Sequence, residues 1–113
     1  MVENGRVLLL KNESFIYDLP GGKVELHQSI ESALIDEFKE ETNLTVKIKS
    51  LIDIKKLNLN NRNILLATYE VENISNDPIK ISYENWGYNF INIKNLRDRE
   101  IKPWIVDLLK NLS

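Results

Sequence analysis

The segment Ser29–Thr42, SIESALIDEFKEET, places acidic residues where an amphipathic helix would place core residues. At about 100° of rotation per residue, Glu37 and Glu41 fall within about 20° of Ile30 around the helix axis. Glu40 lies at the edge of the same apolar stripe, about 80° from Ile30. The apolar residues of this stripe are Ile30, Ala33, Leu34 and Phe38.

Carboxylates at such positions need a reason, because buried charges are normally paired or bound to a metal. The first half of this helix is apolar and its second half is acidic on the same face. We therefore expect its start to be packed against a core and its end to bind a cation. Ser29 is the expected N-cap and Asn43 the expected stop, since asparagine tolerates the left-handed conformation.

Composition excludes several classes of function. The chain has 113 residues and a formal net charge of −2, so no overall basic field favours long nucleic acid or an anionic membrane. Cysteine is absent, which excludes disulfides, thiolate catalysis and zinc–thiolate sites. We find neither an apolar run of membrane-spanning length nor a signal peptide, and therefore expect a cytoplasmic protein with one domain over residues 1–113.

Strand and turn signals predict a mixture of strands and helices. The expected strands are 6–10, 15–19, 44–54, 63–71, 79–83 and 88–93. Residues 58–63 read as a polar loop and residues 75–78 as a turn. A closing helix is expected over 103–112, with Trp104, Leu108 and Leu112 on one face. This pattern is typical of an α/β or α+β domain.

The stretch from Leu19 to Val46, LPGGKVELHQSIESALIDEFKEETNLTV, resembles the Nudix hydrolase family. The family's motif is G-x5-E-x7-R-E-U-x-E-E-x-G-U, where U is an apolar residue. Aligned on Gly22, the chain has Glu37, Glu40 and Glu41 at the motif's last three glutamates. The preceding Tyr-x-Leu-Pro-Gly-Gly and the run VLLLKN also resemble family members.

The resemblance implies an α/β/α sandwich with a mixed β-sheet and a magnesium- or manganese-dependent hydrolase. Its substrate would be a nucleoside diphosphate linked to another group, and the bound ion would assist water in attacking phosphorus. Residues i, i+3 and i+4 share a helical face, so Glu37, Glu40 and Glu41 can converge as metal ligands. Carboxylate oxygens and substrate phosphates are the partners that magnesium prefers.

The chain departs from the motif at three positions. Gln28 replaces its first glutamate, Asp36 its arginine and Asn43 its last glycine. In the family the glutamate and arginine support one another and orient the metal-binding acids. A glutamine amide can donate a hydrogen bond to an aspartate, so we expect the connection to persist without its cation. Asn43 is the mildest change.

The resemblance points to further site residues outside the acidic helix. Glu84 falls where many family members carry another acid that binds metal or acts as a base, although a solvated loop glutamate is the equally weighted alternative. The expected substrate-binding residues are Gly21, Gly22, Lys23 and Glu25. Tyr17, Trp86 and Tyr88 could stack on a base, but core packing is commoner for aromatics on strands.

Two hypotheses remain open at this point. One is an active hydrolase; the other is a weakened or inactive Nudix-fold module that binds a nucleotide or a protein partner. The family usually has a strand before the VLLLKN strand, and this chain has only six residues ahead of Val7. If that first strand is lacking, a homodimer could cover the bare sheet edge.

Overall fold

The apolar run RVLLLK forms strand β2 (Arg6–Lys11), which lies between two hydrophobic cores in the computed structural model. Leu8 belongs to one core together with Phe38, whereas Leu9 belongs to the other together with Ile105. Successive side chains of a strand point to opposite faces, so a strand covered on both faces is apolar throughout. The expected strand at residues 6–10 is thereby confirmed.

The structure describes residues 1–11, 16–22, 24, 27–82, 85, 87–95 and 101–112, and for residues 59, 95 and 112 it describes the backbone alone. The further elements are β1 (Val2–Glu3), β3 (Tyr17–Asp18), α1 (Ile30–Thr42), β4 (Val46–Leu59), β5 (Arg62–Asn73), β6 (Gly87–Asn92), a 3-10 helix η1 (Ile93–Asn95) and α2 (Pro103–Leu112). No helix in these ranges combines the length and the apolar character needed to cross a bilayer.

Strand β2 is the centre of the main sheet. β6 pairs with it antiparallel from Arg6 to Lys11, while β1 and β3 pair with its two ends. Since β6 occupies one edge of β2 over its whole length, β1 and β3 share the other edge. A parallel bridge joins Tyr17 to Ile101, so the sheet is mixed, as expected.

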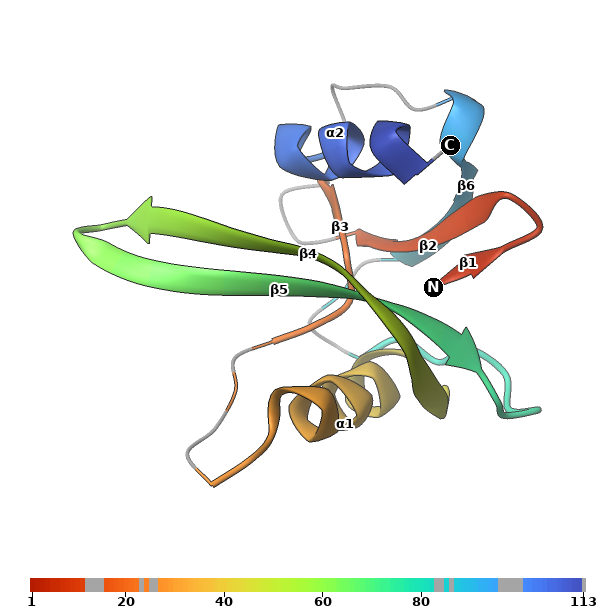
Figure 1. Ribbon diagram of the computed structural model, residues 1–113. Coiled ribbons are helices and arrows are strands. Elements are labelled where there is room, and N and C mark those ends of the chain that lie inside the picture. The colour runs from red at the N-terminus through yellow and green to blue at the C-terminus, as the bar shows by residue number, and fades with distance from the viewer. Residues whose placement is uncertain are drawn as a thin grey trace.

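The two helices lie on opposite sides of the strands (Figure 1). α1 supplies Phe38 to the core that also holds Leu8, and α2 supplies Ile105 to the core that holds Leu9. The expected α/β/α sandwich is confirmed. The buried face of α2 differs from the expected one, because Ile105, Val106 and Leu109 are buried while Trp104 and Leu108 are only partly covered.

Strands β4 and β5 form a long two-stranded hairpin. Its turn consists of Asn60 and Asn61 alone, with φ of 52° and 62°, and the pair Leu59–Arg62 closes it. The predicted loop over 58–63 is therefore wrong for its outer residues. Asparagine accepts positive φ, and two such residues make the tight turn whose twist matches the flanking strands.

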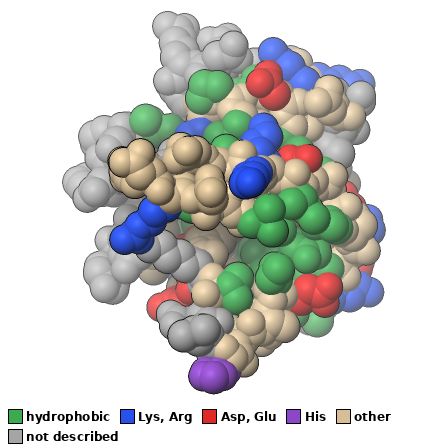
Figure 2. Space-filling model, turned by 60° about the vertical axis from the view of Figure 1, so that its left-hand side comes forward, with side chains coloured by type: hydrophobic (Ala, Val, Ile, Leu, Met, Phe, Trp, Pro, Cys, Tyr) green, Lys and Arg blue, Asp and Glu red, His purple; other side chains and the backbone are tan. Residues whose placement is uncertain are grey.

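The hairpin exposes much of its apolar surface. Among its larger side chains, Leu65 is 65% exposed, Ile54 54% and Leu51 48%. Figure 2 brings the projecting end of the hairpin forward and shows hydrophobic side chains gathered on this face, beside Lys or Arg side chains. The part of the hairpin next to β2 is different, because Val71 and Val46 are buried in the core on the α1 side.

The chain between β5 and β6 also departs from expectation. Residues 75–78 contain no hydrogen-bonded turn, and the described residues 79–82 form no strand. The polar residues of this segment instead make hydrogen bonds of their own, including a bond from the Ser75 backbone N–H to the Asn73 side chain at 2.9 Å. The polar residues that predict a turn here instead form side-chain hydrogen bonds to the backbone of an irregular segment.

The chain does have a short strand ahead of β2. β1 contains only Val2 and Glu3, and it turns back through Asn4 and Gly5, both with positive φ. The hypothesis that the first strand is lacking is therefore not supported, although the strand is reduced to two residues. Its pairing covers only the Arg6 end of β2.

Replacing Phe38 with alanine tests the core on the α1 side. Phe38 is buried, so the change removes a large apolar side chain from between α1 and β2. We expect the free energy of unfolding to fall by about 3–5 kcal/mol, measured by denaturant titration. The control is Ile30→Ala on the same helix, where 45% of the side chain is already exposed. Equal losses for the two variants would contradict this packing.

Candidate functional site

The glycine turn that precedes α1 is held in place by β3. Asp18 pairs with Leu10 of β2, and its Oδ1 accepts a hydrogen bond from the backbone N–H of Leu19 at 2.8 Å. The other carboxylate oxygen of Asp18 contacts Nζ of Lys102, just before α2. Leu19 packs against the core on the α2 side. These contacts fix the direction in which the chain enters Pro20, Gly21 and Gly22.

Both glycines of the turn meet glutamates of α1. A Cβ atom on Gly22 would lie 2.8 Å from Cδ and 2.9 Å from Oε2 of Glu37, so only glycine permits this approach. The backbone N–H of Gly21 donates to Oε2 of Glu41 at 3.4 Å. The turn and two of the expected metal ligands therefore form one packed unit, although about 20 residues separate them in sequence.

Helix α1 begins and ends as the sequence predicts. The Oγ of Ser29 accepts a hydrogen bond from the backbone N–H of Ser32 at 3.1 Å. At the other end Asn43 has φ 69°, in the left-handed region, and its N–H donates to the carbonyl of Lys39. Asn43 thus provides the backbone conformation that the family motif obtains from glycine.

The three glutamates of α1 differ in their surroundings. Glu37 and Glu41 are half-buried against the glycine turn, whereas Glu40 is exposed. Ile30, expected on the packed face, is exposed as well, so the buried start of the helix reduces to Ala33 with partly covered neighbours. The packed stripe is consequently shifted toward Phe38 and the acidic half of the helix.

The altered pair of the motif makes direct contact. Nε2 of Gln28 donates a hydrogen bond to Oδ2 of Asp36 at 2.8 Å. This contact is the one expected from the sequence, with an amide and a carboxylate in place of the family's glutamate and arginine. It links the chain just before α1 to the helix's second turn. It supplies no cation, however, so Asp36 adds negative charge beside the three glutamates.

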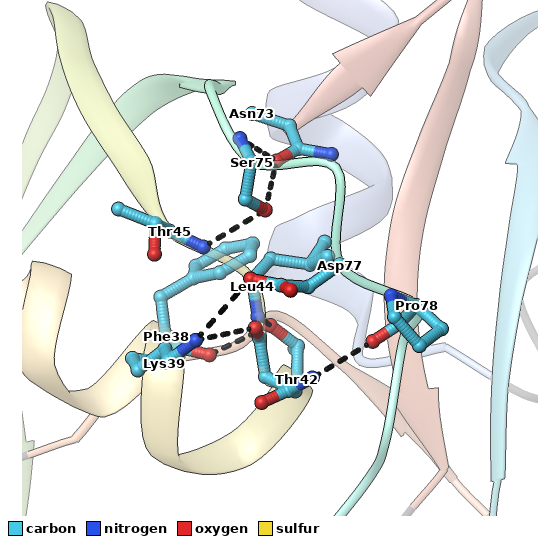
Figure 3. Close-up of polar contacts among 10 residues, drawn as sticks. Phe38, Lys39, Thr42, Leu44, Thr45, Asn73, Ser75, Asp77 and Pro78 are labelled. Atoms are coloured by element: carbon cyan, nitrogen blue, oxygen red, sulfur yellow. Dashed lines mark hydrogen bonds and ion pairs between the residues drawn. The ribbon is translucent and has the colours of Figure 1, made fainter.

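The last turn of α1 is tied down by a buried threonine (Figure 3). Oγ1 of Thr42 donates to the carbonyl of Phe38 at 2.7 Å and accepts from the backbone N–H of Leu44 at 3.1 Å. Thr42 is fully buried. Its hydroxyl group therefore satisfies polar backbone on both sides of the helix end.

A second set of contacts joins the helix end to the irregular segment 77–82. Asn43 Nδ2 donates to the carbonyl of Pro78 at 3.0 Å, and Lys39 Nζ lies 3.7 Å from Oδ2 of Asp77 (Figure 3). The backbone N–H groups of Lys80 and Ser82 donate to the carbonyls of Thr42 and Glu41, respectively. The segment thus follows the end of the acidic helix.

These segment contacts were not anticipated from the sequence. The sequence predicts Asn43 only as a helix stop, but its side-chain amide also carries two donors. The local clue was the replacement of a glycine, which has no side chain, by a residue able to make such a bond. Its partner, 35 residues away, had no sequence signal.

Several expected site residues lie outside the described residues: Lys23, Glu25, Glu84 and Trp86. Their roles stay predictions. Within the described ranges, no three carboxylate or imidazole side chains are close enough together to form a complete metal cage. Glu37 and Glu41 are brought to the glycine turn, whereas Glu40 points to a more exposed position on the same helix.

The aromatic candidates divide between packing and exposure. Tyr17 packs against the core on the α2 side, and Nζ of Lys11 lies 5.5 Å from its ring centroid. Tyr88 is nearly half exposed and meets Phe90 edge-on, with ring centroids 6.5 Å apart. Core packing, the commoner role for an aromatic residue on a strand, thus applies to Tyr17. Tyr88 remains accessible.

The family comparison agrees with this geometry. The family model described as the NUDIX domain matches residues 1–105. The chain belongs to the Nudix family. A region of 56 residues is 41% identical to an ADP-ribose pyrophosphatase from Methanocaldococcus jannaschii, and it covers 46% of this chain but only 33% of that protein. The match to this relative therefore spans about a third of the relative's length.

Solved Nudix structures share the fold. The MutT protein from Methanosarcina mazei Go1 superposes with a TM-score of 0.81 at 22% identity, covering 96% of this chain and 83% of that one. A MutT NUDIX hydrolase from Burkholderia pseudomallei gives a TM-score of 0.81 at 18% identity, covering 100% and 92%. At such identities the likeness concerns the fold.

The contact between Gly22 and Glu37 can be tested by a substitution that should change metal affinity without changing stability. In Gly22→Ala the new methyl group would collide with the flexible end of Glu37, which can move away at little cost. We expect the free energy of unfolding to change by less than about 1 kcal/mol, while magnesium affinity in calorimetry falls by about tenfold. Gly87→Ala, where a Cβ meets no atom within 4 Å, is the control. Unchanged magnesium affinity in Gly22→Ala would contradict the idea that close contact with Gly22 positions Glu37 for metal binding.

Proposed function

We propose that this Nudix protein hydrolyses the diphosphate linkage of a nucleoside diphosphate derivative, with magnesium or manganese as its metal. The observation that carries the proposal is the packing of Glu37 and Glu41 against the glycine turn. This packing places carboxylate oxygens beside the backbone of Gly21 and Gly22. A diphosphate with a bound cation needs both kinds of group, anionic ligands for the ion and N–H donors for phosphate oxygens.

The residues present suit a hard divalent cation. Glu37, Glu40 and Glu41 offer only oxygen donors from one helical face, and the glycine turn leaves no side chain between Glu37 and the turn's backbone. Magnesium keeps several waters and is usually held by one or two carboxylates together with substrate phosphates. A complete cage of protein ligands is therefore not required. Glu37 and Glu41 would hold the ion, with Glu40 as a further ligand.

The reaction requires water to attack one phosphorus atom while the bond from that atom to the bridging oxygen breaks. A bound ion would neutralise charge on the phosphates and lower the pKa of the attacking water. The protein's own task is to orient the carboxylates and to accept the proton of that water. The candidates for the proton acceptor are one of the three helix glutamates, Glu37, Glu40 and Glu41, or Glu84. Lys23 is the candidate for contact with phosphate oxygens, and Glu25 completes the proposed substrate-binding group.

ADP-ribose is the first substrate to test. The relative with 41% identity over 56 residues is an ADP-ribose pyrophosphatase, and this likeness sets the order in which substrates are assayed. The hydrolysis would release AMP and ribose 5-phosphate. Nucleoside triphosphates and dinucleoside polyphosphates complete the panel.

A binding module without turnover is the second candidate, and one observation favours it. The Gln28–Asp36 hydrogen bond keeps the geometry of the motif's pair but contains no cation. At this pair the positive charge of the family's arginine is therefore replaced by a carboxylate. Such a site would still bind a metal–nucleotide complex while orienting water poorly.

Neutralising the acidic residues separates these two candidates. Glu40→Gln combined with Glu41→Gln preserves size but removes two negative charges, so we expect turnover to fall by about 100-fold or more, as for loss of metal ligands. Release of nucleoside monophosphate is the measurement. Glu31→Gln, an exposed acid in the first turn of the same helix, is the matched control and should keep full activity.

The wild-type result is informative in the same assay. Metal-dependent nucleotide binding without turnover would favour the module. Absence of both binding and turnover across the panel would contradict both candidates. Loss of activity in Glu31→Gln to the same extent would show that general helix charge, and not these positions, controls the reaction.

Restoring the motif's ion pair tests the role of Gln28 and Asp36. We expect Gln28→Glu with Asp36→Arg to raise kcat/KM by about tenfold, because the restored pair supplies a cation beside the metal ligands. Gln28→Glu alone is the matched control. It would set two carboxylates face to face where the present donor and acceptor lie 2.8 Å apart, and should lower activity. An unchanged double variant would refute this account of the pair.

A further inference from the structure

The projecting end of the β4–β5 hairpin, residues 53–68, is a surface without a role in the site described above. We call these residues the arm. Within the described chain, β4 and β5 pair only with each other, so both outer edges of the arm carry open backbone groups. Two-stranded hairpins are marginally stable by themselves. An arm of this kind is therefore expected to gain stability from a covering surface.

The arm carries apolar side chains on both of its faces. Directly paired residues share a face, so Ile54 and Ala67 lie on one face, whereas Leu57 and Ile64 lie on the other. Leu65 joins the first of these faces and is the most exposed of them, at 65%. This first face continues the row of Val71 and Tyr69, which pack in the core on the α1 side. The core thus extends outward into an uncovered apolar strip.

The charge of the arm is opposite to that of the remaining chain. The arm contains Lys55, Lys56 and Arg62 but only one acid, Asp53, which gives a net charge of +2. The whole chain has a net charge of −2, so the other residues together carry −4. An arm laid on another arm would bring like charges together. An arm laid on the body of a second molecule would bring opposite charges together.

The size of the contact also favours reciprocal exchange. The arm has seven paired residues per strand, so it is roughly 23 Å long; two strands about 5 Å apart make it roughly 10 Å wide, and one side covers about 230 Å². In a two-fold exchange each protomer gives one arm and receives another, which buries about 460 Å² per partner. Counted over both partners this is about 900 Å², close to the roughly 1,000 Å² at which specific interfaces begin. Arm-on-arm contact would bury about half as much.

We propose that the arm is a dimerisation element. It lies on the net acidic remainder of a second copy of this chain, and the arm of that copy lies on the first copy in the same way. The contact is symmetric and closed, so the assembly stops at two copies. This inference does not depend on the proposed hydrolase activity. It also has a different basis from the sequence-based hypothesis of a homodimer, which relied on a missing first strand.

Sedimentation velocity on the full chain at micromolar concentrations tests the proposal. We expect the mass of two 13.2-kDa chains. Leu65→Ser should raise the dimer dissociation constant by about tenfold or more, as for an apolar anchor at an interface. Leu65→Met keeps the apolar area and should leave the constant nearly unchanged. Because Leu65 is largely exposed in the single chain, circular dichroism should show both variants folded.

Charge reversal distinguishes the two ways of docking the arm. Lys55→Glu with Lys56→Glu changes the arm from +2 to −2. Arm-on-body docking would then bring like charges together, and we expect at least tenfold weaker dimerisation at low salt. Arm-on-arm docking would remain a contact between like charges and would change little, which would contradict our proposal. A chain that stays monomeric at all concentrations, or masses that grow beyond two copies, would also overturn it.

Discussion

The burial of β2 on both faces is the constraint on which the other contacts depend. One strand of six residues faces Phe38 of α1 on one side and Ile105 of α2 on the other. β3 pairs with the end of this strand and leads directly into the glycine turn, so the pairing with β2 fixes the position of the turn. The acidic helix is placed by the same strand through Leu8. Site geometry and core packing are therefore not independent in this protein.

Two carboxylates in the acidic half of α1 accept hydrogen bonds from uncharged groups. Glu41 accepts a hydrogen bond from the backbone N–H of Gly21 and Asp36 accepts one from the side-chain amide of Gln28, and neither of these two donors carries a full positive charge. Hydrogen bonds of this kind hold a carboxylate in place but compensate like-charge repulsion weakly. At the Gln28–Asp36 pair, the contact between the two motif positions is retained, but the positive charge of the motif's arginine is lost.

Sequence reasoning succeeded where the determining interactions are local. The bounds of α2 follow from Pro103 in its first turn, and those of α1 from its two caps. Gln28 and Asp36 were paired correctly because one motif contains both. The two strands of the hairpin were predicted, but the loop between them was predicted too long, because asparagine favours loops and tight turns alike and the distinction depends on strand pairing. The bond between Asn43 and Pro78 depends on tertiary packing that no local pattern reports.

The bonds from segment 77–82 to the end of α1 have a consequence for the protein's motions. Lys80 and Ser82 donate to carbonyls of the last helical turn, so that turn cannot fray without releasing the segment. Such linked elements open as one cooperative unit. The amide hydrogens of Lys80, Ser82 and Asn43 would then exchange with solvent at a common rate. The fluctuations of the last turn of the acidic helix and of the segment up to Ser82 therefore share a single opening equilibrium.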